Sequence, residues 1–133
     1  MEGGVKDLMR YRLEKAGEAL AEAGENIDRG HFSTSLNRSY YAIFHAMRAA
    51  NSLYGFDSQK HSGVIAFFNR TFVKDGRLDG SLSKIIQKAA VCREKSDYQD
   101  FFVADKADAE RQLEDAKVFV AAVGKLLESI QEE

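Results

Sequence analysis

The chain has 133 residues, of which 30% are charged and 44% hydrophobic, with a formal net charge of -2. This length fits one domain, expected over residues 1–133, whose core is large enough to be stable without disulfides or structural metals. The slight negative charge argues against a general electrostatic hold on nucleic acid, so any RNA contact must come from a local basic patch. No run of about 20 apolar residues predicts a membrane span, and the N-terminal segment lacks a signal-peptide core. We therefore expect a cytoplasmic protein without membrane contact.

The single cysteine, Cys92, excludes an internal disulfide framework and fits a reducing compartment. Its neighbours in the segment 89–92 predict a small buried apolar side chain, and a reactive thiol is the alternative interpretation. No set of His, Cys, Asp or Glu residues has the spacing of metal ligands. The sequence therefore predicts neither a metal nor a cofactor.

The chain contains no proline, so it can be almost continuously helical, with glycines marking the ends of helices. Apolar residues recur with a helical period, and no long segment alternates with the period of a strand. We predict five helices, over about 4–29, 31–54, 58–74, 81–96 and from Asp105 onward. Gly30 and Gly55 are expected to end the first two helices, and Asp105 to cap the last. Short connections between long helices predict an all-α antiparallel up-and-down bundle.

The apolar residues of each predicted helix identify the expected core. In the first helix they are Val5, Leu8, Leu13, Ala16, Leu20, Ala23 and Ile27. In the second they are Leu36, Tyr40, Ile43, Met47, Ala50 and Tyr54. An aromatic cluster is also most simply assigned to the core and comprises Phe67, Phe68, Phe72, Phe101 and Phe102.

The second predicted helix also carries a polar stripe. A helix advances about 100° per residue, so Arg38 and His45, which are seven residues apart, lie on one face. Tyr41 lies between them on this face, and Arg48 follows one turn after His45. Arginine is a permanent cation whose planar fork matches phosphate, and histidine moves protons near neutral pH. The pair indicates phosphodiester chemistry if the stripe faces a ligand or a second subunit. A merely solvated polar face is the alternative.

Small residues line the flank between these two sides of the helix, at Ala42, Ala46 and Ala49. Such a flank allows close approach of another helix, and a second copy of the chain is the simplest candidate for it. We therefore expect a homodimer.

Several segments together resemble the HEPN family of small helical-bundle proteins. They are residues 37–46 (Asn-Arg-Ser-Tyr-Tyr-Ala-Ile-Phe-His-Ala), Lys60–Gly63, the Phe-rich third helix, Arg93 followed by Asp97 and Tyr98, and a final helix rich in Glu and Ala. The family motif is an arginine, four to six residues, and a histidine; here six residues intervene. The resemblance extends over about residues 5–128.

This resemblance implies a helical bundle that dimerises through the motif helix and cleaves RNA without a metal. It further implies a toxin restrained by a partner nucleotidyltransferase. Arg38 and His45 then occupy the two catalytic positions. The residues implied to contact the substrate or border the cleft are Ser39, Tyr41, Arg48, Lys60, His61, Arg93, Asp97 and Tyr98.

Two departures accompany the resemblance. Ser39 follows the arginine where active members usually carry Asn, Asp or His. Met47 stands where one subgroup has a tyrosine that its antitoxin modifies with AMP, so the resemblance does not extend to that control. A catalytically silent HEPN module that binds a nucleotide or a nucleotidyltransferase is the alternative function, and a structural adaptor is a third.

Each of three further surface features allows two interpretations. Arg93 and Asp97 form either an ordinary ion pair one helical turn apart or a buttress of the cleft. The basic fourth helix, with Lys84, Lys88, Arg93 and Lys95, is either a solvated face or an edge that guides RNA. His31 and His61 are isolated in the sequence and predicted at the surface, although Lys60 and His61 can still border the cleft.

Overall fold

The computed structural model describes residues 3–98 and 103–131 of the chain. Within these residues every regular element is helical and no strand occurs, as predicted. Five α-helices are joined by short connections, and a 3₁₀ turn and a π turn extend two of them. They are α1 (Gly3–Asp28), α2 (Phe32–Asn51) with η1 (Ser52–Tyr54), α3 (His61–Phe68) with η2 (Asn69–Val73), α4 (Ser81–Tyr98) and α5 (Lys106–Gln131).

The predicted helix boundaries have clear local causes. Gly30 and Gly55 adopt left-handed backbone angles, with φ of 77° and 67°, which end the helical segments before them. Asp105 caps α5, because its Oδ1 accepts a hydrogen bond of 2.8 Å from the backbone N–H of Asp108. The third helix begins at His61 rather than near residue 58, because Lys60 is still extended.

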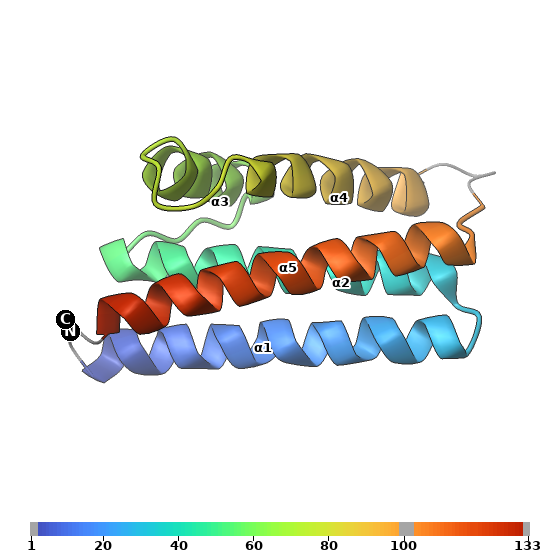
Figure 1. Ribbon diagram of the computed structural model, residues 1–133, viewed down its shortest axis with the longest axis horizontal. Coiled ribbons are helices and arrows are strands. Elements are labelled where there is room, and N and C mark those ends of the chain that lie inside the picture. Colours follow the sequence, from blue (N-terminus) through green and yellow to red (C-terminus); the bar gives the residue numbers. More distant parts are fainter. Residues whose placement is uncertain (1–2, 99–102, 132–133) are drawn as a thin grey trace.

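Figure 1 shows α1, α2, α4 and α5 running side by side along the long axis, as expected for an up-and-down bundle. The short α3 lies at one end, beside the start of α4. α5 passes in front of α2 in this view, and α1 and α4 lie on opposite sides of that pair. Among the described residues, no helix is both long and apolar enough to cross a membrane.

Helix α2 is the central element of the bundle and contacts α1, α3, α4 and α5. Its small residues Ala42, Ala46 and Ala49 are completely buried within the single chain. α1 makes the most extensive contact with α2 and carries buried alanines of its own. The expectation that a second copy covers this flank is therefore wrong, because the chain's own helices cover it.

The buried stripe of α1 agrees only in part with the predicted one, since Ala16 and Ala23 are buried as predicted. It consists of Met9, Arg12, Ala16, Ala19 and Ala23, whereas the predicted core residue Leu8 is 40% exposed. A second correction concerns Tyr54, which is 55% exposed and accepts a hydrogen bond from Arg77 instead of entering the core. The other predicted apolar residues of α2, including Tyr40 and Met47, are buried.

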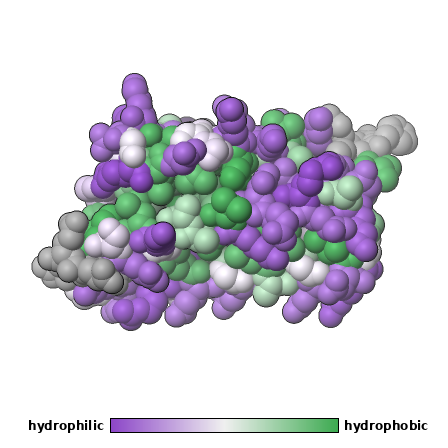
Figure 2. Space-filling view, viewed as in Figure 1, coloured by the Kyte–Doolittle hydropathy of each residue, from purple (hydrophilic) through white to green (hydrophobic). Residues whose placement is uncertain are grey.

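Aromatic packing fills the space where α3 and η2 meet α5. Phe68 and Phe72 are fully buried, and the Phe68 ring lies 5.4 Å from that of Phe119. Phe67 is only partly buried and stacks on Phe56. Phe101 and Phe102 lie outside the described residues. On the face that carries α5, hydrophobic residues gather toward the end where α5 finishes, and hydrophilic residues dominate the rest (Figure 2).

A buried guanidinium connects α1 to the end of α2. Arg12 is only 8% exposed, and it donates hydrogen bonds of 3.0 Å to the carbonyl oxygen of Arg48 and to Asp57 Oδ2. Asp57 also accepts two bonds from Arg48, at 3.2 and 2.9 Å. The hydrogen bonds from Arg48 are the largest cause that lowers the pKa of the Asp57 carboxyl. One carboxylate thus compensates two cations.

We predict that Asp57→Asn lowers the free energy of unfolding at neutral pH. The loss should be about 1–2 kcal/mol, less than for a fully buried pair because Asp57 is half exposed. Because the pKa of Asp57 is lower in the folded than in the unfolded chain, its carboxylate stabilises the folded state at pH values above the ordinary pKa of about 3.9. This contribution is lost as the pH falls through the lowered pKa. The difference between wild type and variant should therefore shrink in acid, as measured by urea unfolding at several pH values.

Asp75→Asn is the matched control for this experiment. Asp75 pairs with Arg77 at 3.5 Å on the surface, and an exposed pair contributes about 0–1 kcal/mol. Equal losses for the two variants would contradict the role assigned to Asp57.

Candidate active site on helix α2

The stripe Arg38–Tyr41–His45–Arg48 is half-buried along α2. The groups that surround it come from α1, from α3 with the segment before it, and from α4. Together they form a cluster of contacts along α2, which we call the motif groove; its members are Arg38, Tyr41, His45, His61 and Arg93. None of the contacts of the motif groove described below comes from α5.

Tyr41 lies at the centre of the motif groove. The guanidinium of Arg38 lies 5.3 Å from the centre of its ring, and that of Arg93 lies 5.7 Å away. The rings of His45 and His61 lie 6.2 and 5.9 Å from it. One aromatic ring therefore contacts two cations and two imidazoles, which fixes their relative positions.

Arg38 keeps its charge available for an anion. Its Nε and Nη2 donate to Oδ1 of Asn37, with an Nε–Oδ1 distance of 3.1 Å, and this neutral amide orients the guanidinium without neutralising it. Among the described residues Arg38 forms no ion pair. Beside it lies a polar hollow of about 490 Å³, lined by residues that include Glu22, Asn26 and Asp97.

His45 is surrounded by positive charge. Burial is the main cause that lowers its pKa below the ordinary value, and the nearby charges of Arg48, Lys15, Arg38 and Arg12 lower the pKa further. The imidazole is therefore neutral near pH 7, which suits a proton acceptor. A bound phosphate would offset these cations and raise the pKa again.

His61 lies in the motif groove, whereas its isolation in the sequence favours a surface position and the resemblance places it with Lys60 at the border of the cleft. Its Nδ1 forms a hydrogen bond of 2.9 Å with the hydroxyl of Tyr40, and its ring lies 4.2 Å from that of Phe44. Burial, and then the charge of Arg93, lower the pKa of this imidazole. Because Nδ1 is held by Tyr40, Nε2 is the nitrogen left for another partner.

The start of α3 holds His61 in place. The hydroxyl of Ser58 accepts a hydrogen bond of 3.1 Å from the N–H of Lys60, and a Cβ at Gly63 would approach that hydroxyl to 2.8 Å. Gly63 therefore lets the turn pack closely on the first turn of α3. The side chain of Lys60 is exposed beside His61.

Arg93 lies over two tyrosine rings, at 5.1 Å from Tyr40 and 5.7 Å from Tyr41. Its Nε is 3.4 Å from Asp97 Oδ2 but makes no hydrogen bond of good geometry within the described residues. The predicted ion pair therefore forms, and Arg93 also borders the motif groove. The side chain of Tyr98 lies outside the described residues.

Two of the residues implied to contact substrate have other partners. Ser39 is fully buried, and its hydroxyl faces the bundle without a described partner, so it does not reach the motif groove. Arg48 is held by both oxygens of Asp57, so much of its charge is compensated. Among the described residues, no three His, Cys, Asp or Glu side chains gather as metal ligands.

The site also contains Arg12, Lys15, Asn37 and Asp57, which the sequence did not predict. The spacing from Met9 to Arg12 to Ala16 was the available signal for Arg12, because it continues the buried stripe of α1. Asp57 carried no signal, since its partners lie 9 and 45 residues away in the chain.

Comparison with known proteins identifies the family. The model of the HEPN domain matches residues 9–126. The chain belongs to the HEPN family. Relatives of similar length include a UPF0332 protein of Thermotoga maritima, which is 30% identical over 93% of this chain and 94% of its own. A protein named "Putative toxin MJ0142" from Methanocaldococcus jannaschii is 32% identical over 96% of this chain and 86% of its own.

Solved structures support the fold. The protein TT1696 from Thermus thermophilus superposes with a TM-score of 0.76 at 18% identity, over 89% of this chain and 97% of its own. ST0689, described as an archaeal HEPN homologue, superposes with a TM-score of 0.63 at 17% identity, also over 89% of this chain and 97% of its own. The resemblance drawn from the motif residues is thus confirmed for the family and for the helical-bundle fold.

We predict that the pKa of His45 lies below the ordinary value of about 6.5 and rises in Lys15→Met. The substitution removes one cation and keeps an apolar side chain, so the burial of the imidazole changes little. An NMR titration of the imidazole signals measures the change. Lys125→Met, in α5, is the control and should leave the His45 titration unchanged, because Lys125 is not among the charges that lower the pKa of His45. A His45 pKa that does not move in Lys15→Met would contradict the electrostatic account.

Proposed function

We propose that this HEPN protein is a metal-independent endoribonuclease and the toxin of a pair with a nucleotidyltransferase. The observation that carries the proposal is the motif groove, in which the uncompensated Arg38 and the neutral, cation-surrounded His45 share one aromatic ring. A site that concentrates positive charge around an imidazole suits a substrate that brings a phosphate. The name of the Methanocaldococcus relative supports the toxin assignment.

The proposed reaction uses the RNA's own 2′-hydroxyl. His45 accepts the proton from that hydroxyl while the 2′-oxygen forms a bond to phosphorus. The bond from phosphorus to the 5′-oxygen then breaks, and a protonated imidazole delivers a proton to the departing oxygen. Arg38 donates to the non-bridging oxygens and opposes the negative charge that grows on them. The products are a 2′,3′-cyclic phosphate and a 5′-hydroxyl.

This chemistry needs two proton-transferring groups, and one chain offers a single histidine on the α2 stripe. We propose that a homodimer formed across the motif groove supplies a second His45. The alanine flank is excluded as the interface because it is buried within the chain. The half-buried stripe itself is the part of α2 that remains available to a partner.

The other groove residues receive supporting roles. Tyr41 positions Arg38 and His45, and Nε2 of His61 and the exposed Lys60 contact the RNA backbone. Arg93, buttressed by Asp97, adds positive charge at the α4 side. The polar hollow beside Arg38 is large enough for one nucleoside next to the bound phosphate. RNA as substrate and a single reduced cysteine agree with the proposed cytoplasmic location.

A silent module that binds a nucleotide or a nucleotidyltransferase is the second candidate. It is favoured by the lowered pKa of both groove imidazoles, which disfavours the protonated form that a general acid requires. The same groove would then bind a phosphate without cleaving a bond.

We predict that the purified protein cleaves RNA in the presence of EDTA and that His45→Ala and Arg38→Ala each lower the rate at least about 100-fold. Release of a 2′,3′-cyclic phosphate from a labelled RNA is the measurement. His31→Ala and Arg29→Ala are the matched controls, since both residues are exposed outside the groove, and they should keep wild-type rates. Activity per chain should fall on dilution if the dimer is required.

Cleavage that survives in His45→Ala would contradict the assigned chemistry. Absence of cleavage in every protein, together with a rise in melting temperature on addition of ATP that Arg38→Ala abolishes, would establish the silent module instead.

A further inference from the structure

The polar hollow beside Arg38 lies at the end of the bundle where α1 and α4 finish and α2 begins (Figure 1). Its volume of about 490 Å³ is within the usual range for small-molecule sites. Glu22 and Asn26 line it from α1, Asn37 and Arg38 from α2, and Asp97 from α4, together with hydroxyl side chains. Arg38 belongs both to this hollow and to the motif groove, so the two adjoin at its guanidinium.

Two amides of the polar hollow have orientations that their partners determine. Nδ2 of Asn26 donates a hydrogen bond of 2.8 Å to the carbonyl oxygen of Glu22, which can only accept, so Oδ1 remains as an acceptor. Oδ1 of Asn37 accepts a bond of 3.1 Å from Nε of Arg38, which can only donate, so Nδ2 remains as a donor. The hollow therefore combines an amide acceptor from α1 with an amide donor from α2.

Carboxylates make the polar hollow rich in acceptors. Glu22 is exposed and forms no ion pair among the described residues. Asp97 lies 3.4 Å from Nε of Arg93 through Oδ2, which leaves Oδ1 without this partner. Because an ionised carboxylate only accepts hydrogen bonds, these groups repel a phosphate and attract N–H donors. A phosphate held by Arg38 would therefore lie on the side of the motif groove and leave the hollow to a nucleoside.

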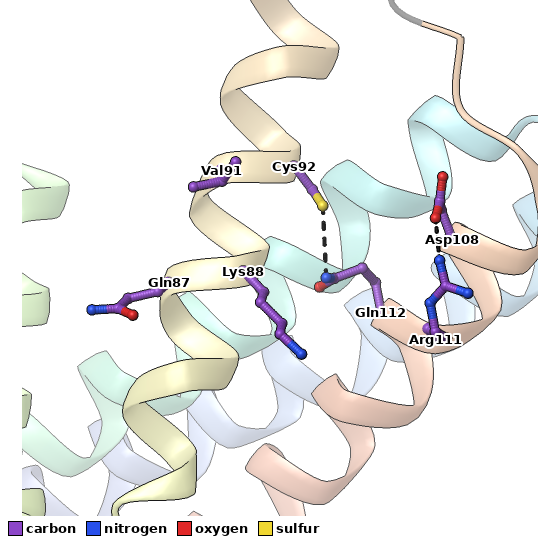
Figure 3. Close-up of a pocket in the computed structure, with 7 residues that line it drawn as sticks. All are labelled: Gln87, Lys88, Val91, Cys92, Asp108, Arg111 and Gln112. Atoms are coloured by element: carbon purple, nitrogen blue, oxygen red, sulfur yellow. Dashed lines mark hydrogen bonds and ion pairs between the residues drawn. The ribbon is translucent and has the colours of Figure 1, made fainter.

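A different hollow, between α4 and α5, offers no comparable set of groups (Figure 3). There Asp108 is paired with Arg111, and the amide of Gln112 lies against the thiol of Cys92. Cys92 is partly buried, and burial is the main cause that raises the pKa of its thiol, which agrees with a packed rather than a reactive side chain. The polar hollow differs because its free acceptors adjoin a guanidinium that no described carboxylate compensates.

We infer that the polar hollow selects guanine as the base next to the phosphate held by Arg38. Proteins read unpaired bases through hydrogen bonds to their Watson–Crick edges. On that edge guanine carries N1–H and the N2 amino group side by side, which match the two oxygens of the Glu22 carboxylate, and its O6 accepts from Nδ2 of Asn37. The inference rests on the proposed function in one respect, that a phosphate binds at Arg38.

The other bases fit this arrangement less well. Adenine and cytosine each place a ring nitrogen acceptor beside their amino group, and a carboxylate repels that lone pair. Uracil has a single N–H between two carbonyl oxygens, so it cannot pair with both oxygens of one carboxylate. Guanine alone brings two adjacent donors to an acceptor-rich surface.

Guanosine 3′,5′-bisphosphate is the probe, because it has a phosphate on either side of the nucleoside and no internucleotide bond to cleave. Isothermal titration calorimetry of the full chain measures its dissociation constant beside those of the inosine, adenosine, cytidine and uridine 3′,5′-bisphosphates. The guanosine compound should bind at least about tenfold more tightly than the adenosine, cytidine and uridine compounds. Inosine keeps N1–H and lacks the N2 amino group, so its affinity should lie between.

Variants assign the preference to the polar hollow. Glu22→Gln keeps the size of the side chain and replaces one acceptor oxygen by a donor. It should weaken guanosine binding about tenfold and change adenosine binding little. Glu25→Gln, one turn later on α1 and outside the hollow, is the matched control and should bind as wild type does. Arg38→Ala should weaken all five compounds to a similar extent, because their phosphate loses its partner.

Failure of this inference and failure of the ribonuclease proposal give different results. Equal affinity for all five bisphosphates, with loss of binding in Arg38→Ala, would overturn the selection of guanine and leave the proposed phosphate site intact. An unchanged preference for guanosine in Glu22→Gln would also overturn it, as would the absence of binding by any bisphosphate at millimolar concentrations. Selective binding of guanosine by a protein that cleaves no RNA would support the inference and contradict the ribonuclease.

Discussion

The enclosure of α2 by the other helices is the constraint on which the remaining arrangement depends. Alanines along one flank of α2 are completely buried, and close packing there leaves no freedom for the helix to rotate about its axis. The residues on the remaining stripe are consequently fixed on the side of α2 that carries the motif groove. Arg38 and His45 face that groove because the alanines face inward.

Electrostatics around the stripe add to this geometric effect. Asp57 compensates Arg12 and Arg48, while Lys15 is paired with Glu18 on the surface of α1. Arg38 has only a neutral amide as its partner among the described residues. The motif groove therefore holds a half-buried imidazole near a cation, Arg38, that no described carboxylate compensates, and a phosphate is the group that would pair with this cation. After burial, nearby cations are the next cause that lowers the pKa of His45 in the free protein, and these same cations would favour the anionic substrate that we propose.

The sequence predicted those parts of the structure that depend on local periodicity. Helix ends at Gly30 and Gly55, the cap at Asp105 and the shared face of Arg38 and His45 all follow from neighbours within a few turns. The pairing of His61 with Tyr40, by contrast, joins residues 21 positions apart and depends on how α3 folds back onto α2. The alanine flank was assigned to the wrong partner for a related reason. Periodicity reveals that a surface is packed and does not reveal which helix packs on it.

If His45 and His61 belong to one anion-binding groove, as we propose, the three histidines of the chain allow a direct test. A short RNA whose 2′-hydroxyls are replaced by fluorine can bind there without being cleaved. In an NMR titration with this RNA, the imidazole signals of His45 and His61 should shift together with one affinity, while those of the exposed His31 stay unchanged. Shifts of equal size at all three histidines, or none at His45 under conditions where the RNA binds, would contradict the account.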